Sequence, residues 1–184
     1  YWGIKGAEDL GGGLKAIFDL NGFYRTDNGR TGRFDGDAMF SRNAYVGLQS
    51  DRAGTLKLGR NTTPYFISTI LFNPLVDSYV FSPAIFHTYF TATNGTVFDP
   101  GIIGDSGWSN SLVYSTPTFG GLTANLIYSF GEQAGATGRN KWGGNLMYFN
   151  GPLAATVAFQ QVKFNNVPGD VTSPAAMVGF RKQN

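Results

Sequence analysis

The sequence predicts an all-β protein, and three observations support this prediction. Apolar residues recur at every second position along much of the chain, which is typical of strands with one apolar face, and no stretch repeats them with a helical period. The alternating runs are close in length to the tilted strands of about 9–11 residues that cross a membrane. Short turns alternate with longer connections. Together these features predict a transmembrane antiparallel up-and-down β-barrel, of which about nine strands are present.

The first clear alternation follows a turn with three consecutive glycines, within Asp9–Gly13. One set of alternate positions after this turn is apolar: Leu14, Ala16, Phe18 and Leu20. The positions between them carry two charges, an amide and one isoleucine: Lys15, Ile17, Asp19 and Asn21. Because successive side chains of a strand point to opposite faces, this strand offers one apolar face and one polar face.

Later runs repeat this alternation, and short and long connections join them in turn. The predicted strands are Met39–Gln49, Thr55–Arg60, Trp108–Ser115, Leu122–Phe130, Lys141–Phe149, Leu153–Gln160 and Ala175–Lys182. The short turns are Asp9–Gly13, Ser50–Gly54, Thr116–Gly121 and the hairpin pair Asn150-Gly151. The longer connections are Thr26–Asp37, Pro64–Ser106, Glu132–Asn140 and Asn165–Pro174. Short turns at one end and long loops at the other are typical of outer-membrane barrels.

The composition of the second face separates a barrel from a soluble β-sandwich. The solvent face of a sandwich usually carries many charges, but only 14% of these residues are charged, against roughly 25% in an ordinary soluble domain. The second face is rich in small neutral residues, as the wall of a water-filled lumen can be. Aromatic residues gather near predicted strand ends, for example at Phe23-Tyr24 and Tyr148-Phe149, which suits interfacial girdles. The barrel is favoured, and the sandwich is the alternative.

Charge and composition exclude several classes of protein. Fourteen basic residues nearly balance twelve acidic ones, so the chain has no basic footprint of a nucleic-acid partner. It has no cysteine, which excludes disulfides and thiolate metal sites. The single histidine, His87, has no Gly-x-Ser-x-Gly motif to accompany it. We therefore expect no enzymatic activity, no cofactor and no metal site.

The connection Pro64–Ser106 is far longer than the roughly 4–6 residues of an ordinary loop, so we expect it to be functional or disordered. Its many aliphatic and aromatic residues argue against disorder. Folded inward against a barrel wall, this segment would form a constriction loop over residues 64–106. Its acidic side chains, Asp77, Asp99 and Asp105, would then lie at the constriction together with His87. The alternative is an external flap or a contact between subunits.

Three stretches carry a resemblance to a known family: Trp2–Phe18, Ser41–Pro64 and Tyr114–Leu122. They resemble the general porins of Gram-negative outer membranes, in the β-proteobacterial and neisserial branch. The similarity runs from Trp2 to about Phe159, and the stretch Trp-Gly-Ile-Lys-Gly-x-Glu-Asp-Leu-Gly-Gly-Gly-Leu-Lys-Ala is its most specific part. The resemblance implies a sixteen-stranded homotrimeric barrel in outer-membrane lipid. It also implies a third loop folded into the lumen, and a basic wall facing acids on that loop.

The resemblance also implies that the family barrel extends beyond this chain at both ends. We expect another strand before Tyr1 and several beyond Asn184, so that residues 1–184 form a single porin domain that is incomplete at both ends. About nine strands do not close such a barrel, and an open sheet edge is not viable in lipid.

Two family arginines are missing from this sequence. The family often has one at the position of Tyr1 and another within Gly107–Ser109, and their absence weakens the expectation of strong anion selectivity. Arg42 matches a constriction arginine of the family. Arg60 resembles a residue that is more often tied to subunit contacts.

The alternation of polar and apolar residues predicts which face of its strand each basic candidate occupies. Lys5 and Lys15 share their faces with polar positions and are expected in the lumen, because a lysine facing lipid at mid-membrane costs about 2–4 kcal/mol. Arg42 alternates with apolar residues, so either a bulge near Ser41 resets the register or this wall is a protein interface. Arg60 has the same conflict. The candidate pore residues are Lys5, Lys15, Arg42, Arg60, Asp77, Asp99 and Asp105.

These features predict a passive diffusion channel for ions and small hydrophilic solutes in the outer membrane. Opposed charges across a narrow gap would orient water and polar solutes, and size would exclude larger ones. Two alternatives stay open: a soluble all-β carbohydrate-binding sandwich, and a channel selective for a class of small anions.

Overall fold

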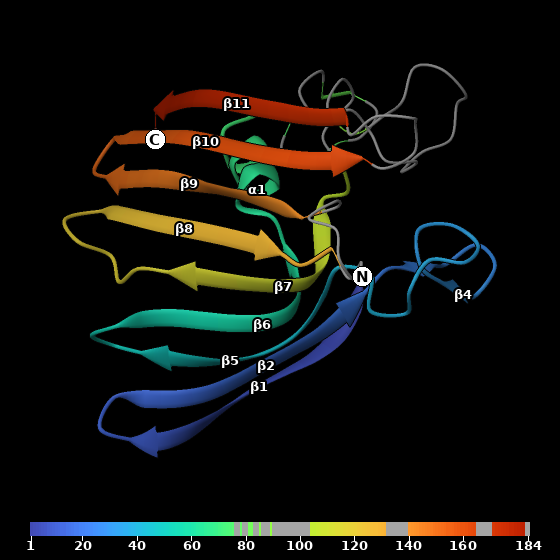
Figure 1. The fold of residues 1–184 in the computed structure, drawn as a ribbon, viewed down its shortest axis with the longest axis horizontal. Coiled ribbons are helices and arrows are strands. Elements are labelled where there is room, and N and C mark those ends of the chain that lie inside the picture. The colour runs from blue at the N-terminus through green and yellow to red at the C-terminus, as the bar shows by residue number, and fades with distance from the viewer. Residues whose placement is uncertain are drawn as a thin grey trace.

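The structure is a computed structural model of the chain, and it describes residues 1–75, 78, 81–82, 85, 89, 104–131, 140–164 and 171–182. Nine strands form one sheet in which each strand pairs antiparallel with the next (Figure 1). In sheet order they are β1 (Trp2–Gly11), β2 (Leu14–Gly22), β5 (Asn43–Ser50), β6 (Gly54–Thr62), β7 (Gly107–Ser115), β8 (Leu122–Ser129), β9 (Lys141–Asn150), β10 (Leu153–Phe164) and β11 (Val171–Lys182). The predicted all-β, up-and-down order of about nine strands is confirmed.

A small hairpin lies outside this sheet. It consists of β3 (Tyr24–Arg25) and β4 (Arg30–Thr31), within the long connection between β2 and β5. In Figure 1 it projects beyond the end of the main sheet at which β1 begins and β2 ends. The connection predicted as a polar, glycine-rich loop therefore contains a short paired segment of its own.

One face of the main sheet is apolar and exposed. Leu14, Phe18, Leu126 and Val157 are 37%, 40%, 54% and 52% exposed, so these side chains do not gather in a sealed core. Among the described residues, the only other sheet is the two-stranded hairpin, and no second layer covers the apolar face as it would in a sandwich. No helix in the described part of the chain is long and apolar enough to cross a membrane.

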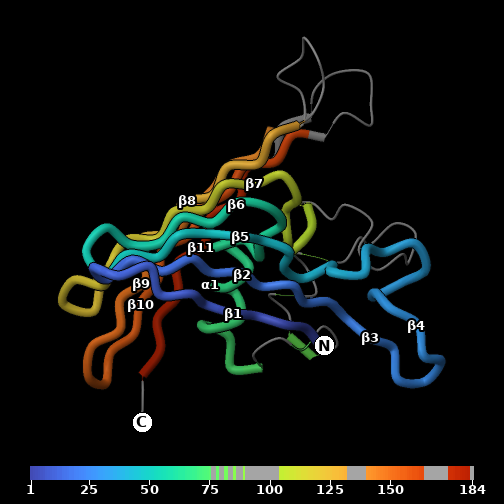
Figure 2. The backbone as a smooth tube through the Cα atoms, turned by 90° about the horizontal axis from the view of Figure 1, so that it is seen from below, coloured from blue at the N-terminus to red at the C-terminus, as the bar shows by residue number. Residues whose placement is uncertain are grey.

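The opposite face holds a short helix, α1 (Pro64–Leu71). It begins at Thr63, whose hydroxyl accepts a hydrogen bond from the Phe66 backbone N–H at 3.2 Å, and Pro64 occupies the first turn. The sheet bends around α1, which lies against β8, β9 and β10 (Figure 2). Because the sequence has no helical period here, the periodicity of its apolar residues does not predict α1.

Buried hydrogen bonds hold α1 on the sheet. The Asn145 side-chain amide of β9 donates to the Pro64 carbonyl and to the Ser68 hydroxyl, both at 2.8 Å. The Ser68 hydroxyl also lies 3.1 Å from the Thr156 hydroxyl of β10. An apolar cluster completes the contact: Tyr65, Phe66, Ile85, Tyr89 and Ala158. Since buried polar groups must be paired, these bonds fix where the helix sits on its wall.

Several boundaries differ from the prediction: β10 continues to Phe164 rather than ending at Gln160, and β11 begins at Val171 rather than Ala175. The strand expected from Met39 begins only at Asn43, and residues before it form turns. At the other end of the sheet, Asn150 is the last residue of β9, so the hairpin loop is Gly151-Pro152 rather than Asn150-Gly151. Gly151 has φ +55°, which favours glycine, and the fixed φ of Pro152 suits the position after it.

The register changes on β6 rather than near Ser41. The pairing of β6 with β7 shifts between Gly59 and Asn61. Gly59 has φ +130°, and a Cβ there would lie 2.3 Å from the Ala44 carbonyl oxygen, so this bulge requires glycine. The bulge expected near Ser41 is not found, because the pairings of β5 with β2 and β6 show no register shift, and the irregularity on β6 belongs to its pairing with β7.

Candidate functional site

The polar face of β1, β2 and β5 is organised around Asp19. The Asn21 side-chain amide donates to one Asp19 carboxylate oxygen at 2.6 Å, and the Asn43 amide donates to the other at 3.3 Å. Lys5 lies directly opposite Asp19 on β1, and Tyr45 lies opposite it on β5. Charge and hydrogen bonding are therefore concentrated on the face that α1 also occupies.

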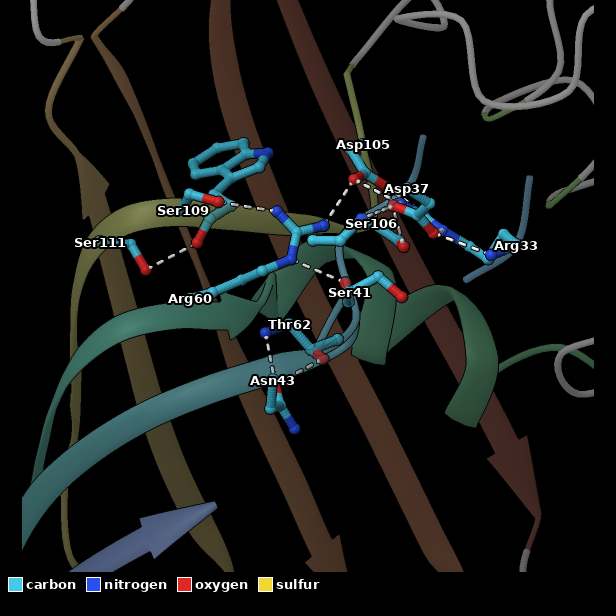
Figure 3. Close-up of polar contacts among 12 residues, drawn as sticks. Arg33, Asp37, Ser41, Asn43, Arg60, Thr62, Asp105, Ser106, Ser109 and Ser111 are labelled. Carbon is cyan, nitrogen blue, oxygen red and sulfur yellow. Dashed lines mark hydrogen bonds and ion pairs between the residues drawn. The ribbon is translucent and has the colours of Figure 1, made fainter. Parts of the chain in front are cut away.

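Lys57 extends this polar face onto β6. Its ammonium nitrogen lies 4.9 Å from the centre of the Tyr45 ring, within the range of a cation–π contact. Asn43 also joins the two strands, because its side-chain oxygen accepts from the Thr62 backbone N–H at 2.9 Å and from the Thr62 hydroxyl at 3.0 Å (Figure 3). Asn61 is buried next to them and donates to the Ser111 hydroxyl of β7 at 3.1 Å.

Arg42 reaches the same face as Lys57. It precedes the first paired residue of β5, so strand alternation does not fix its direction. Its guanidinium carbon lies 4.1 Å from the centre of the Tyr1 ring. Arg42 and Lys57 both line a cavity of about 210 Å³ whose other wall includes Phe66 of α1. The conflict between Arg42 and the apolar alternation of β5 disappears, because Arg42 is not part of the strand.

Arg60 belongs to a different group of charges, which also contains Arg33, Asp37 and Asp105 (Figure 3). By alternation it shares the face of Leu58, and it pairs with Ala44. Its guanidinium donates to the Ser41 carbonyl at 2.7 Å, to the Ser109 hydroxyl at 2.9 Å and to the Asp105 carboxylate at 2.7 Å. All three of its donor nitrogens are therefore used within the protein.

Arg33 completes this group, which we call the charge cluster: Arg33, Asp37, Arg60 and Asp105. Arg33 donates to the two Asp105 oxygens at 2.6 and 3.0 Å, in a bidentate pair. It also donates to Asp37 at 2.8 and 3.2 Å. The side chains of Arg33 and Asp37 are each only 7% exposed, and that of Asp105 is 27% exposed. The cluster joins the β4–β5 connection to the segment just before β7.

The titration of this cluster follows from its pairing. Burial alone raises the pKa of Asp105, but the hydrogen bonds and charges of Arg33 and Arg60 outweigh it, so the pKa lies below its ordinary value. Burial likewise raises the pKa of Asp37, and the hydrogen bonds from Arg33 bring it below its ordinary value. Burial lowers the pKa of Arg33, yet the two carboxylates raise it overall. Arg33, Asp37 and Asp105 are therefore charged at neutral pH.

The predicted candidates thus fall into separate places. Lys5 and Lys15 lie on the polar face, with Lys15 opposite Asp9 and Gln49 near the first turn. Arg42 lies across the cavity from α1, and Arg60 and Asp105 meet in the charge cluster. Asp77 and Asp99 lie outside the described residues, as does His87.

Sequence reasoning missed two groups at this site. Lys57 is not among the predicted candidates, yet it lies between Leu56 and Leu58, so the alternation that selects Lys5 and Lys15 also selects it. Arg33 carries no local signal for its pairing with Asp105, because that partner is 72 residues away, and Asp37 joins the cluster only through Arg33. Within the described ranges, no three acidic or histidine side chains are grouped as metal ligands.

Comparison with known proteins gives a consistent family match. The profile of a family described as Gram-negative porin matches residues 1–182. An outer membrane porin protein of Bordetella pertussis is 31% identical over 180 residues, which are 90% of this chain and 42% of that protein. Outer membrane porin protein 32 of Delftia acidovorans is 35% identical over 166 residues, 88% of this chain and 44% of that protein.

A solved structure gives the same result. The structure described as an anion-selective porin from Comamonas acidovorans superposes with a TM-score of 0.74 and 26% sequence identity. The match covers 97% of this chain and 52% of that one. This chain therefore spans about half the length of the relatives that it matches.

Proposed function

This chain belongs to the Gram-negative porin family, its relatives are outer membrane porins, and its location is the outer membrane; from this premise, we propose that it forms part of the wall of a passive diffusion channel. The channel would admit ions and small hydrophilic solutes. Its strands span the membrane, and the solutes pass along the polar face.

The observation that carries this proposal is the division of the same strands into two unlike faces. Leu56 and Leu58 of β6 are 37% and 49% exposed, whereas Lys57 between them is half-buried on the polar side. Exposed leucines on a long, otherwise uncovered face are stable in contact with hydrocarbon. A lysine at the same depth is tolerated only where it meets water, because facing lipid would cost about 2–4 kcal/mol.

Residues 64–106 are part of the same proposal, as a constriction loop folded inward within a single domain of residues 1–184. The packing of α1 on the polar face supports this placement. The Asn145 and Ser68 hydrogen bonds attach the start of the segment to β9 from the inside. An external flap would leave these buried polar groups without partners.

We expect only a modest preference for anions. Arg42 and Lys57 line the polar face, and each rests on a tyrosine ring rather than on a carboxylate. Arg60 is neutralised by Asp105, so it adds little to the field in the lumen. The related Comamonas protein is described as anion-selective. For this chain we expect the same preference for anions but a weaker one, because the wall carries two cations together with the Asp19 carboxylate.

The proposal includes a homotrimer and excludes a catalytic role. The trimer rests on the resemblance to the trimeric general porins, and cross-linking of the intact protein in mild detergent tests it. A monomer under those conditions would remove this part. Passive filtering needs no nucleophile or cofactor, since the wall acts by charge and size alone.

The experiment that tests the function is reconstitution of the intact full-length protein into planar lipid bilayers. We expect stepwise conductance increases in potassium chloride that stay open without an energy source. A pure protein that inserts and gives no steps would contradict the proposal. A full-length protein that stays soluble without detergent would favour the carbohydrate-binding alternative instead.

A further inference from the structure

The cavity between α1 and the polar face has two chemically different walls. Its volume is about 210 Å³, smaller than the roughly 300–1,000 Å³ of sites for drug-sized ligands. The sheet wall supplies Arg42 and Lys57, and the helix wall supplies Phe66, Ile67 and Ile70. A compact ligand in this space would meet cations on one side and hydrocarbon on the other.

The cationic wall keeps its charge for a ligand. Within the described residues, the lining contains two cationic side chains and no carboxylate, and neither Arg42 nor Lys57 forms an ion pair. The Tyr1 and Tyr45 rings hold them at 4.1 and 4.9 Å. Since a ring contact orients a cation without neutralising it, both charges remain available to an anion.

An acidic group on the same face, Asp19, is already engaged. Asp19 lies close enough to Lys57 to attract it electrostatically, but its two oxygens accept the amides of Asn21 and Asn43. Asp19 is not part of the cavity lining. The two cations against this one carboxylate leave a net positive charge beside the cavity.

The helix wall selects for an apolar body. Phe66, Ile67 and Ile70 lie on the side of α1 that faces the cavity, while Ser68 on another side bonds to the sheet. A fully hydrated inorganic anion gains nothing from this wall. An organic anion gains by removing apolar area from water at roughly 25 cal/mol per Å².

From this geometry, we infer that the cavity is a binding site for small monocarboxylates with an aromatic or branched aliphatic body. The carboxylate lies between Arg42 and Lys57, and the body lies against Ile67 and its neighbours on α1. This inference rests on the proposed channel, and it makes that channel selective for one class of organic anion.

The test compares two carboxylates in planar bilayers that contain the intact full-length protein at pH 7 and constant chloride. Sodium benzoate has the apolar ring and sodium acetate lacks it. We expect benzoate to halve the chloride current at a concentration about tenfold lower than acetate does. This ratio corresponds to the removal of about 55 Å² of apolar area from water. Equal effects of benzoate and acetate on a conducting channel would overturn the inference alone. A protein without conductance would overturn the proposed function itself.

Variants locate the site. Lys57→Met should raise the half-blocking concentration of both carboxylates, whereas Ile67→Asn should raise that of benzoate about fivefold and leave acetate unchanged, because only the ring loses a partner. Lys163→Met is the matched control, since Lys163 of β10 lies outside the cavity lining. If Lys57→Met gives no channels, Ile67→Asn decides: an unchanged benzoate block there contradicts the inference.

Discussion

Two sets of basic side chains at neighbouring parts of the sheet have opposite surroundings. Arg33 and Arg60 are almost fully committed to carboxylates and carbonyls in the charge cluster. Arg42 and Lys57 rest on tyrosine rings at the edge of a cavity and form no ion pair within the described residues. The same residue types therefore serve structure in one place and, in the proposed channel, would supply the electric field in the other.

The difference shows why counting basic residues does not predict selectivity. A buried arginine paired bidentately with a carboxylate presents little net charge to a passing ion, yet its loss leaves a buried partner without compensation. An arginine that rests on a tyrosine ring behaves in the opposite way. Its removal changes the electric field but leaves no carboxylate unpaired. Each prediction below tests one side of this division, beginning with the largest effect.

Removing the central carboxylate should have the largest effect on stability. Asp105→Ala leaves Arg33 and Arg60 without their shared partner. We expect the free energy of unfolding to fall by about 3 kcal/mol. This value is at the low end for a broken buried ion pair, because Asp105 is partly exposed. Urea unfolding of the refolded full-length protein measures this. Asp35→Ala is the control, because its pairs with Arg25 and Arg30 are exposed and should contribute little. Equal losses in the two variants would show that the cluster has no special role.

Acidification should weaken the same cluster. The pKa values of Asp37 and Asp105 lie below their ordinary values in the folded state, so both carboxylates contribute stability that is complete above about pH 4. This contribution is lost as the pH falls through the folded-state values. The loss should be smaller than in Asp105→Ala, because a protonated carboxyl still forms hydrogen bonds.

The control for this pH dependence is Asp105→Asn, which cannot titrate at that position. Urea unfolding at a series of pH values between about 3 and 6 should give a flatter profile for this variant than for the parent. Parallel profiles for both proteins would contradict the assignment of acid sensitivity to the cluster.

Removing a cation from the cavity should change selectivity but not stability. A unit charge about 8 Å from an ion in water contributes about 0.5 kcal/mol, so Arg42→Ser should lower chloride permeability relative to potassium by about two- to fivefold. The reversal potential in a salt gradient measures this ratio. An unchanged reversal potential would remove Arg42 from the ion path.

The smallest expected effect is that of Arg60 on the same measurement. Arg60→Gln should shift the reversal potential less than Arg42→Ser does, because Arg60 lies in the charge cluster and outside the cavity lining, although the variant leaves Asp105 with one cation fewer. The variant should nevertheless unfold at a lower urea concentration than the parent. A shift in reversal potential as large as that of Arg42→Ser would mean that Arg60 faces the lumen.

The strands were predictable because one physical constraint determines them. A strand with an apolar and a polar environment on its two sides must alternate, and Leu14 to Asn21 and Leu56 to Leu58 do so. α1 was not predictable in this way. Its eight residues are apolar almost all round, and the contact of Asn145 with Ser68 holds it in place from β9. The only local signal was Thr63 followed by Pro64.

The site was predictable only where a side chain acts through its own strand. Alternation placed Lys5 and Lys15 on the polar face, and the same rule applies to Lys57. The pairing of Arg60 with Asp105 joins residues 45 positions apart, and it depends on the pairing of β6 with β7 across the long connection between them. A bulge at Gly59 also separates Arg60 from the regular alternation, so a periodic rule does not give its partner.

The central claim, that one face of these strands meets lipid and the other meets water, is tested most directly on β6. Single cysteines replace Leu56, Lys57 and Leu58 in turn, in the full-length protein reconstituted in lipid vesicles and freed of any other cysteine; residues 1–184 contain none. The rate of reaction with a charged, membrane-impermeant thiol reagent is then measured. We predict fast labelling at position 57 and slow labelling at 56 and 58. Labelling at 56 and 58 that is as fast as at 57 would contradict the account.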